Sequence, residues 1–164
     1  MRHLVLLALL GAATAQAQAQ EVRRLGLAES PISASVEVPA GSRLVYISGT
    51  VPDPADSAAP AGSVQRYGDT AAQTRSILAK VQAQLGRHGL GLGDVVMMRV
   101  FLVAPPGQPR MDFAGMMSAY REFFGTAAQP NRPARSTMQV AGLVDPGWLV
   151  EIEVTAAARG GEAR

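Results

Sequence analysis

Apolar side chains recur at helical spacing in two stretches of the chain. One apolar face of the first stretch is formed by Ala71, Thr74, Ile77, Leu78, Val81 and Leu85. Asp69 precedes this stretch as a good N-cap, and Gly86 and Gly89 follow it. The second stretch starts near Asp112, ends at Gly125, and has an apolar face of Phe113, Met116, Met117, Tyr120, Phe123 and Phe124. The spacing therefore predicts two amphipathic helices, each packing one face on a core.

Strand-like segments surround these two helices. Ser35 to Val38 and Arg43 to Ser48 are joined by a turn-rich link, Pro39 to Ser42, which predicts a β-hairpin. Residues 20–34 are irregular or form a short edge strand, and residues 50–68 form a long loop. Asp94 to Val103 holds too few polar residues for a half-exposed strand, so it is predicted to be central and covered on both faces.

The last two strands are predicted at Arg135 to Ala141 and Trp148 to Ala156, with a turn from Gly142 to Gly147 between them. Alternation in the final strand places Leu149, Glu151, Glu153 and Thr155 on one face. The order β-β-α-β-α-β-β predicts an α+β sandwich, with one sheet and two helices on one of its faces. Leu149 and the apolar side of the central strand indicate that a partner subunit covers the other face.

The N-terminus has the three-part pattern of a secretory signal. Arg2 and His3 precede an apolar run from Leu4 to Leu10, and small-residue A-x-A sites follow up to Ala19. We expect residues 1–19 to be removed and residues 20–164 to form a single domain that is periplasmic or secreted. The alternative is a frayed helix of a cytosolic protein. The run is too short to span a bilayer and no cysteine follows it, so no membrane anchor is expected.

Composition narrows the chemistry of the site. The chain has 164 residues, a formal net charge of +2 and no run of Lys or Arg, which argues against nucleic acid as a partner. It has no cysteine, and His88 is the only histidine beyond the signal segment. A thiol nucleophile is therefore excluded, and a zinc site or a Ser-His-Asp triad would need His88 itself, for which a helix C-cap role is the commoner explanation.

Two charged residues are candidates for a site. Arg135 follows Pro133 and Ala134 at a strand start, where its planar fork suits a carboxylate ligand. Glu151 stands mid-strand between two apolar residues, where a carboxylate facing a partly apolar cavity can pass protons. Spacing alone favours plainer interpretations, a surface ion pair for Arg135 and a solvated strand face for Glu151.

The closing stretch PARSTMQVAGLVDPGWLVEIEV resembles the closing hairpin pattern of the Rid family (reactive intermediate deaminase, also called YjgF). Upstream, Val45 to Gly49 resembles the family's strand ending in Ser-Gly, and Phe113 to Met117 with Tyr120 to Phe124 resembles its second helix. The matches run in order over about residues 30 to 157, and the closing motif is the specific one.

The resemblance implies a chorismate-mutase-like homotrimer with clefts between subunits. It implies hydrolysis of 2-imino and enamino acids to 2-oxo acids and ammonia, without metal or cofactor. By position, Arg135 would clamp the substrate carboxylate, Gly49 and Thr137 would help to seat it, and Glu151 would activate water and manage protons. The substrate-binding positions where the family has a tyrosine and an asparagine are occupied here by Ser35 and Met117.

These two departures reshape the pocket and leave more than one function open. The first alternative is a trimer that binds small carboxylates without turnover, and a weaker one is a scaffold or chaperone-like trimer. Nuclease activity has been proposed for some family members, but the low net charge of this chain does not support it.

Overall fold

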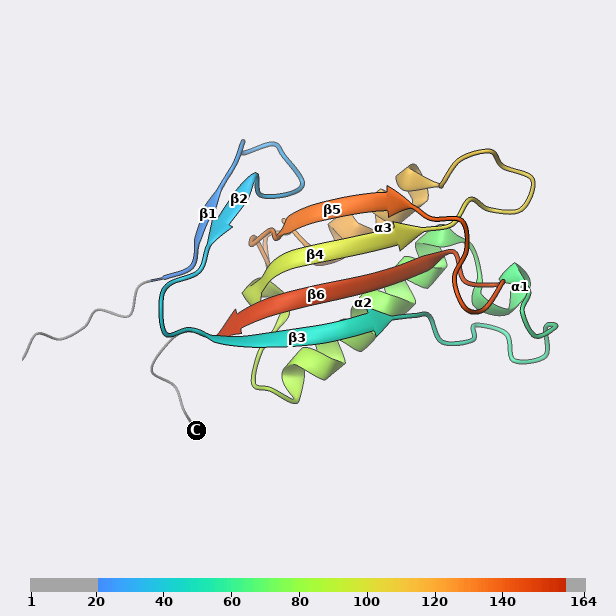
Figure 1. Ribbon diagram of the computed structural model, residues 1–164, viewed down its shortest axis with the longest axis horizontal. Helices are drawn as coiled ribbons and strands as arrows, with labels where there is room; N and C mark the ends of the chain where they lie inside the picture. The colour runs from blue at the N-terminus through green and yellow to red at the C-terminus, as the bar shows by residue number, and fades with distance from the viewer. Residues whose placement is uncertain (1–20, 159–164) are drawn as a thin grey trace, which may run out of the picture.

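The computed structural model describes residues 21–158, in which one mixed sheet of four strands forms the centre of the fold. Its strands, in spatial order, are β3 (Arg43–Thr50), β6 (Val150–Ala158), β4 (Val95–Leu102) and β5 (Ala134–Gln139). β6 is antiparallel to both of its neighbours, whereas β4 and β5 are parallel. β1 (Arg23–Leu25) and β2 (Ser35–Glu37) form a separate antiparallel pair beyond one end of the sheet (Figure 1).

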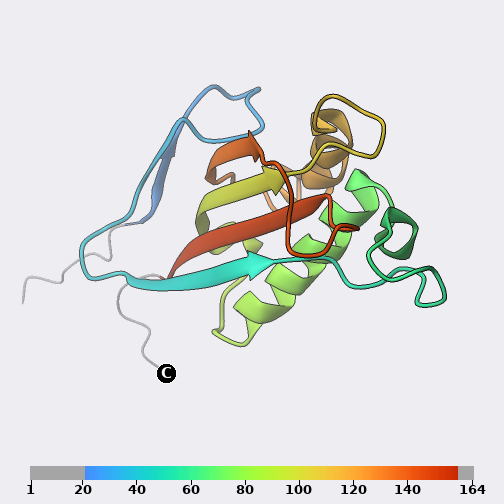
Figure 2. The ribbon, with the colours of Figure 1, turned by 45° about the vertical axis from the view of Figure 1, so that its right-hand side comes forward.

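Two long helices, α2 (Thr70–Gly86) and α3 (Phe113–Phe123), cover one face of the sheet, as both views show (Figures 1 and 2). Shorter helical turns are α1 (Val64–Tyr67), within the long loop after β3, and η1 (Leu92–Asp94), just before β4. The predicted α+β architecture, with its helices on one face, is confirmed.

Both long helices begin where they were predicted to begin, and an aspartate caps each of them. The Asp69 carboxylate accepts a hydrogen bond from the backbone N–H of Ala72 at 2.8 Å, and the Asp112 carboxylate accepts one from Gly115 at 2.8 Å. Each bond satisfies a helical donor that has no partner within the helix. The predicted apolar faces then pack on the sheet, and the fully buried side chains there include Ile77, Leu78, Val81, Leu85, Met98, Val100 and Met116.

The hairpin predicted between residues 35–38 and 43–48 is wrong. β2 pairs with β1, whereas β3 pairs with the final strand, β6. The physical reason is burial: Val45 and Ile47 of β3 are buried in the core, beside the apolar face of β6. β2 is too short and too exposed to cover that face, so the link between them carries the chain from one sheet to the other.

The closing hairpin is also wrong, because β4 lies between β5 and β6. The final strand begins at Val150, two residues later than predicted, and Leu149 is 2% exposed. Leu149 is therefore covered by the core of its own chain, and its apolar side chain does not indicate a partner subunit.

β4 is an interior strand, as predicted, but the described residues cover only one of its faces. Met98, Val100 and Leu102 alternate into the core beneath the helices, and Val95 joins them across an irregularity of β4 between Val95 and Met97. On the opposite face, which we call the open face of the sheet, Met97 and Phe101 are half-buried and Arg99 is exposed. That a second subunit covers the open face stays a prediction.

Within residues 21–158, no helix has the length and apolar character needed to cross a membrane. The predicted signal segment, residues 1–19, lies outside the described residues.

Candidate functional site

Arg135 lies on the helix-covered face of the sheet, near the start of the edge strand β5. Its cross-strand partner is Met98, a fully buried residue of the core, which fixes the side on which the arginine points. α3 covers it there: the guanidinium carbon lies 4.4 Å from the centroid of the Tyr120 ring, and Nη2 lies 3.0 Å from the Met117 sulfur. The Phe113 ring, 44% exposed, has its centroid 6.0 Å away.

This guanidinium has aromatic and thioether neighbours instead of a carboxylate. Its Nη1 is buried and has no hydrogen-bond partner among residues 21–158, and neither has the hydroxyl of Thr137, two residues along the same face of β5. Burial lowers the pKa of Arg135, the nearby Arg121 lowers it further, and Tyr120 opposes the shift. The group remains charged, because the ordinary pKa of arginine is so high. A half-buried cation with a buried, unused donor is an arrangement that fits an anionic ligand.

Glu151 is seated against Gly49 at the other end of the sheet. β3 carries an irregularity between Ile47 and Thr50, where Ser48 and Gly49 together stand opposite a single residue of β6. A Cβ built on Gly49 would lie 2.8 Å from the carboxyl carbon of Glu151 and closer still to Oε1. The glycine therefore makes room for the carboxylate, and these two predicted site residues are brought together.

Arg135 and Glu151 are not brought together within the chain. Arg135 is level with Met98, which pairs with Val154, whereas Glu151 pairs with Phe101. That register separates the two residues by three positions along the strands and by two strand spacings across them, about 10 Å in each direction. They also point to opposite faces, because Phe101 belongs to the open face and Met98 to the helix-covered face.

The remaining predicted site residues divide between these two places. Met117 and Thr137 lie with Arg135, as described above. Ser35 is exposed at the start of β2, two residues after Ser33, which bridges to Ala134 just before Arg135. The start of β2 is thus tied to the start of β5, although no hydrogen bond joins Ser35 to Arg135.

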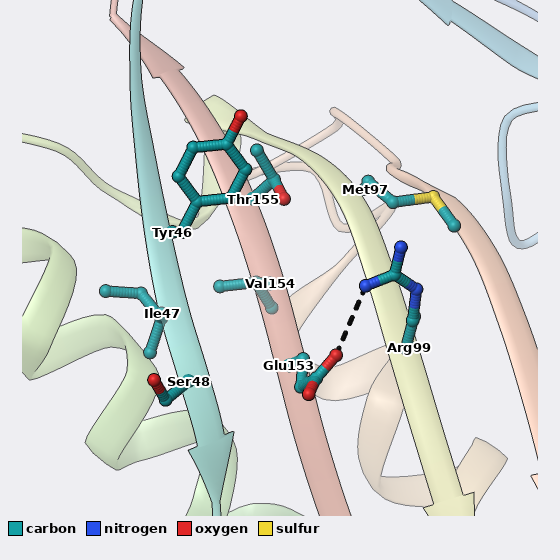
Figure 3. A pocket seen from close by; sticks show the side chains of 8 residues that line it. All are labelled: Tyr46, Ile47, Ser48, Met97, Arg99, Glu153, Val154 and Thr155. Carbon is teal, nitrogen blue, oxygen red and sulfur yellow. Dashed lines mark hydrogen bonds and ion pairs between the residues drawn. The ribbon is translucent and has the colours of Figure 1, made fainter.

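A shallow depression of about 220 Å³ hollows the open face of the sheet. Figure 3 shows Tyr46 and Ser48 of β3, Glu153 and Thr155 of β6 and, on β4, Arg99, which forms an ion pair with Glu153 at 3.3 Å. The depression lies on the face away from Arg135. It contains an exposed aromatic ring, since Tyr46 is 73% exposed, and an ion pair that faces outward.

Two features of the site escaped sequence analysis. The role of Tyr120 as a platform for Arg135 was hidden in an apolar stripe, although its place three residues after Met117 puts both on one helix face. Gln73 is fully buried in α2, but the sequence does not indicate its burial, because a polar residue at that spacing is equally compatible with a solvent-facing position. Among residues 21–158, no group of three or more His, Asp or Glu side chains is arranged to hold a metal ion.

Comparisons with known proteins agree on one family. The family described as Endoribonuclease L-PSP matches residues 27–158 of the chain. The 3-aminoacrylate deaminase RutC of Acinetobacter baylyi is 33% identical over 122 residues, which are 74% of this chain and 85% of that protein. The 2-iminobutanoate/2-iminopropanoate deaminase of Escherichia coli is 34% identical over 117 residues, 71% of this chain and 80% of that protein.

Solved structures with the same fold include the YjgF gene product of E. coli, with 28% identity and a TM-score of 0.56 over 84% of this chain and 99% of that one. E. coli TdcF with bound serine is also 28% identical, with a TM-score of 0.55 over 83% of this chain and 98% of the other. Sequence match, fold and chain coverage therefore agree, and this protein belongs to the Rid family, also called YjgF.

Proposed function

We propose that this protein hydrolyses 2-imino and enamino acids to 2-oxo acids and ammonia, at sites shared between the subunits of a homotrimer. The observation that carries the proposal is the half-buried guanidinium of Arg135, whose buried Nη1 has no hydrogen-bond partner among the described residues. A substrate carboxylate is the anion that such a planar fork binds best. The deaminase names of the relatives from A. baylyi and E. coli support the same reaction class.

The separation of the two charged residues supports the shared site. Within one chain Arg135 and Glu151 face opposite sides of the sheet. A neighbouring subunit that covers the open face would set its own Arg135 beside this chain's Glu151. The open face suits such cover, because Tyr46 is 73% exposed there and Met97 and Phe101 are only half-buried.

The chemistry then requires little more than positioning and proton transfer. Arg135 holds the carboxylate of the protonated imine. Glu151 takes a proton from a water molecule while the oxygen of that water bonds to the imine carbon. The C=N π electrons move to nitrogen, and Glu151 returns the proton there. Glu151 then takes the remaining hydroxyl proton as the C–N bond breaks and the carbonyl forms, and it passes this proton to the departing ammonia, which leaves as ammonium. The balance is one iminium acid and one water in, one 2-oxo acid and one ammonium ion out. An enamine first takes a proton on its β-carbon to become the imine.

Met117 favours a second candidate, a trimer that binds small carboxylates without turnover. Its thioether contacts Nη2 of Arg135 and can neither donate a hydrogen bond nor accept a strong one, so it cannot help to orient a water molecule or an imine nitrogen. In this alternative the arginine still binds the anion, but the reaction centre lacks a polar partner on that side.

The experiment that tests the proposal measures imine turnover. Imines are generated in place by an amino-acid oxidase from a panel of amino acids, and ammonia release is compared with spontaneous hydrolysis. We expect acceleration by the purified protein. Binding of 2-oxo acids without acceleration for any amino acid would replace the enzyme with the binder.

A mixing experiment tests the shared site separately. Arg135→Lys and Glu151→Gln are each expected to be inactive. Random exchange of subunits between them would rebuild an intact pair at about a quarter of the interfaces, because each site draws its arginine and its glutamate from different subunits. Recovery of about a quarter of wild-type activity is expected. No recovery after verified subunit exchange would show that the site lies within one chain.

A further inference from the structure

Gln73 is a polar residue in the interior of the fold. It lies on the core-facing side of α2 and is 0% exposed. Burial of an amide is costly unless its donors and its acceptor are paired, and here all are used. Its Nε2 donates to the carbonyls of Gly68 and Gly147, both at 2.9 Å, and its Oε1 accepts from the backbone N–H of Leu149 at 2.8 Å.

These three bonds join two loops that are far apart in sequence. Gly68 ends the long loop before α2, and Gly147 lies in the loop that leads into β6. Figure 1 shows both loops at the same end of the sheet. The same two loops are joined a second time, because the Tyr67 hydroxyl donates to the Asp145 carboxylate at 2.8 Å. The loop before β6 is therefore held from within the core by Gln73 and at its outer end by Tyr67.

Leu149 is the residue through which this anchor reaches the site. Its N–H is held by Gln73, and its carbonyl accepts a hydrogen bond from Val103 at 2.9 Å. Glu151 follows two residues later, about 7 Å further along an extended chain. The Glu151 carboxylate lies directly against Gly49, where a Cβ would meet it.

We propose that Gln73 is a positioning residue for the deamination reaction, and that it sets the place of Glu151 by fixing the backbone at the start of β6. The expected effect on kcat rests on the proposed function. The expected displacement of Glu151 rests on the structure alone. The hydrogen bonds of Gln73 go to Gly68, Gly147 and Leu149, whereas Arg135 lies on β5 against α3, so carboxylate binding and proton transfer are expected to respond separately.

The matched pair of variants is Gln73→Met and Thr74→Val. Methionine keeps the size of the side chain but makes none of the three hydrogen bonds. Thr74 is also 0% exposed and neighbours Gln73, but its hydroxyl donates only to Thr70 within the same helix, at 2.7 Å. Both variants lose buried hydrogen bonding, and only the first loosens β6.

We expect Gln73→Met to lower kcat about ten- to hundred-fold, as for a reacting group displaced by about 1 Å, with 2-oxo acid affinity within about twofold of wild type. Thr74→Val is expected to lose stability without this loss of kcat. Equal loss of kcat in the two variants, or loss of affinity in step with kcat, would overturn the proposal, because either result describes general destabilisation.

A geometric measurement separates this proposal from the proposed function. Amide hydrogen exchange at Leu149 is expected to accelerate in Gln73→Met, and a crystal structure of that variant is expected to show the Glu151 carboxylate displaced from Gly49. A carboxylate unmoved over Gly49 would refute the positioning role even where activity falls. An inactive wild type would refute the proposed function and leave this geometric test standing.

Gln73→Glu provides the same test if the methionine variant fails to fold. When protonated, the new carboxyl can accept from Leu149 and donate to one of the two glycine carbonyls, but when ionised it repels both. Relative to wild type, its kcat is expected to rise as the pH falls. A ratio to wild type that is constant with pH would contradict the proposal.

Discussion

The guanidinium carbon of Arg135 lies 4.4 Å from the centroid of the Tyr120 ring, so the cation rests on an aromatic face. The ring is fixed at its far end, where its hydroxyl donates to the carbonyl of Pro31 at 3.1 Å. Tyr120 thus connects the proposed carboxylate site on β5 to the segment that precedes β2.

Alkaline stability should reveal this buried tyrosine. Burial raises the pKa of Tyr120 from 10.0 to about 12, with Arg135 and Arg132 opposing the shift. Above pH 10 the unfolded chain loses this proton while the folded chain keeps it, so the free energy of unfolding should fall as the pH rises from 10 towards 12. A pKa shift of about two units corresponds to a loss on the order of 2 kcal/mol in the free energy of unfolding.

Denaturant unfolding from pH 9 to 12 measures this loss. Tyr120→Phe should show a smaller decline than wild type. Some decline should remain in that variant, because the hydrogen bond to Asp145 also raises the pKa of Tyr67. Identical pH profiles for wild type and Tyr120→Phe would contradict the assignment to Tyr120.

Arg135→Lys should weaken carboxylate binding while the protein stays folded. Lysine retains the charge but loses the planar fork, so a carboxylate would be held by one contact instead of two. Loss of a charge-assisted hydrogen bond costs about 1.5–3 kcal/mol, or about one to two orders of magnitude in affinity. Calorimetric titration with a 2-oxo acid measures this effect, and circular dichroism checks the fold. Affinity equal to that of wild type would remove Arg135 from the site.

Glu151→Gln should have the opposite signature. It leaves Arg135 intact, so 2-oxo acid affinity should stay within about twofold, while kcat falls about 10²- to 10⁴-fold through loss of the proton carrier. Steady-state kinetics on one imine and titration with its 2-oxo acid separate the two effects. Full turnover in this variant would mean that another group handles the protons.

Gly49→Ala should displace the Glu151 carboxylate without unfolding the chain. The added methyl group overlaps the end of a flexible side chain, which can turn away at modest cost, and does not overlap backbone. We expect kcat to fall about tenfold or more, while the free energy of unfolding changes by about 1 kcal/mol. Ser48→Ala, one residue earlier in the same irregularity of β3, is the matched control and should retain turnover.

Export is also proposed, since residues 1–19 have the pattern of a secretory signal. The protein recovered from the periplasm or the medium should begin near Gln20. Mass analysis of its N-terminus provides the measurement. Intact Met1 on protein confined to the cytosol would refute the proposal.

Periodicity determined the two helices and their caps. Asp69 is an N-cap as predicted, and Asp112, near which the second helix was predicted to start, caps that helix in the same way, through a short-range hydrogen bond to a residue three positions away. Asp94 to Val103 was predictable as an interior strand, since few polar residues interrupt it. Arg135 and Glu151 could be nominated from their strand positions and from a resemblance concentrated in the closing stretch.

Only the tertiary structure decided which strands meet. Sequence neighbours suggested two hairpins, yet β3 pairs with β6, and β4 separates β6 from β5. Strand pairing is a non-local choice: the apolar faces of distant segments compete for one core, and local turn signals do not reveal the result.

The face on which each charged residue lies was likewise a tertiary outcome. Arg135 pairs with Met98 and therefore lies on the helix-covered face beneath α3. Glu151 pairs with Phe101 and therefore lies on the open face. The bonds of Gln73 and the ring beneath Arg135 also depend on contacts across the fold. The sequence by itself determined the local elements and the chemical groups, because these depend on neighbours along the chain. Where those groups stand relative to one another depends on long-range packing, which only the folded structure specifies.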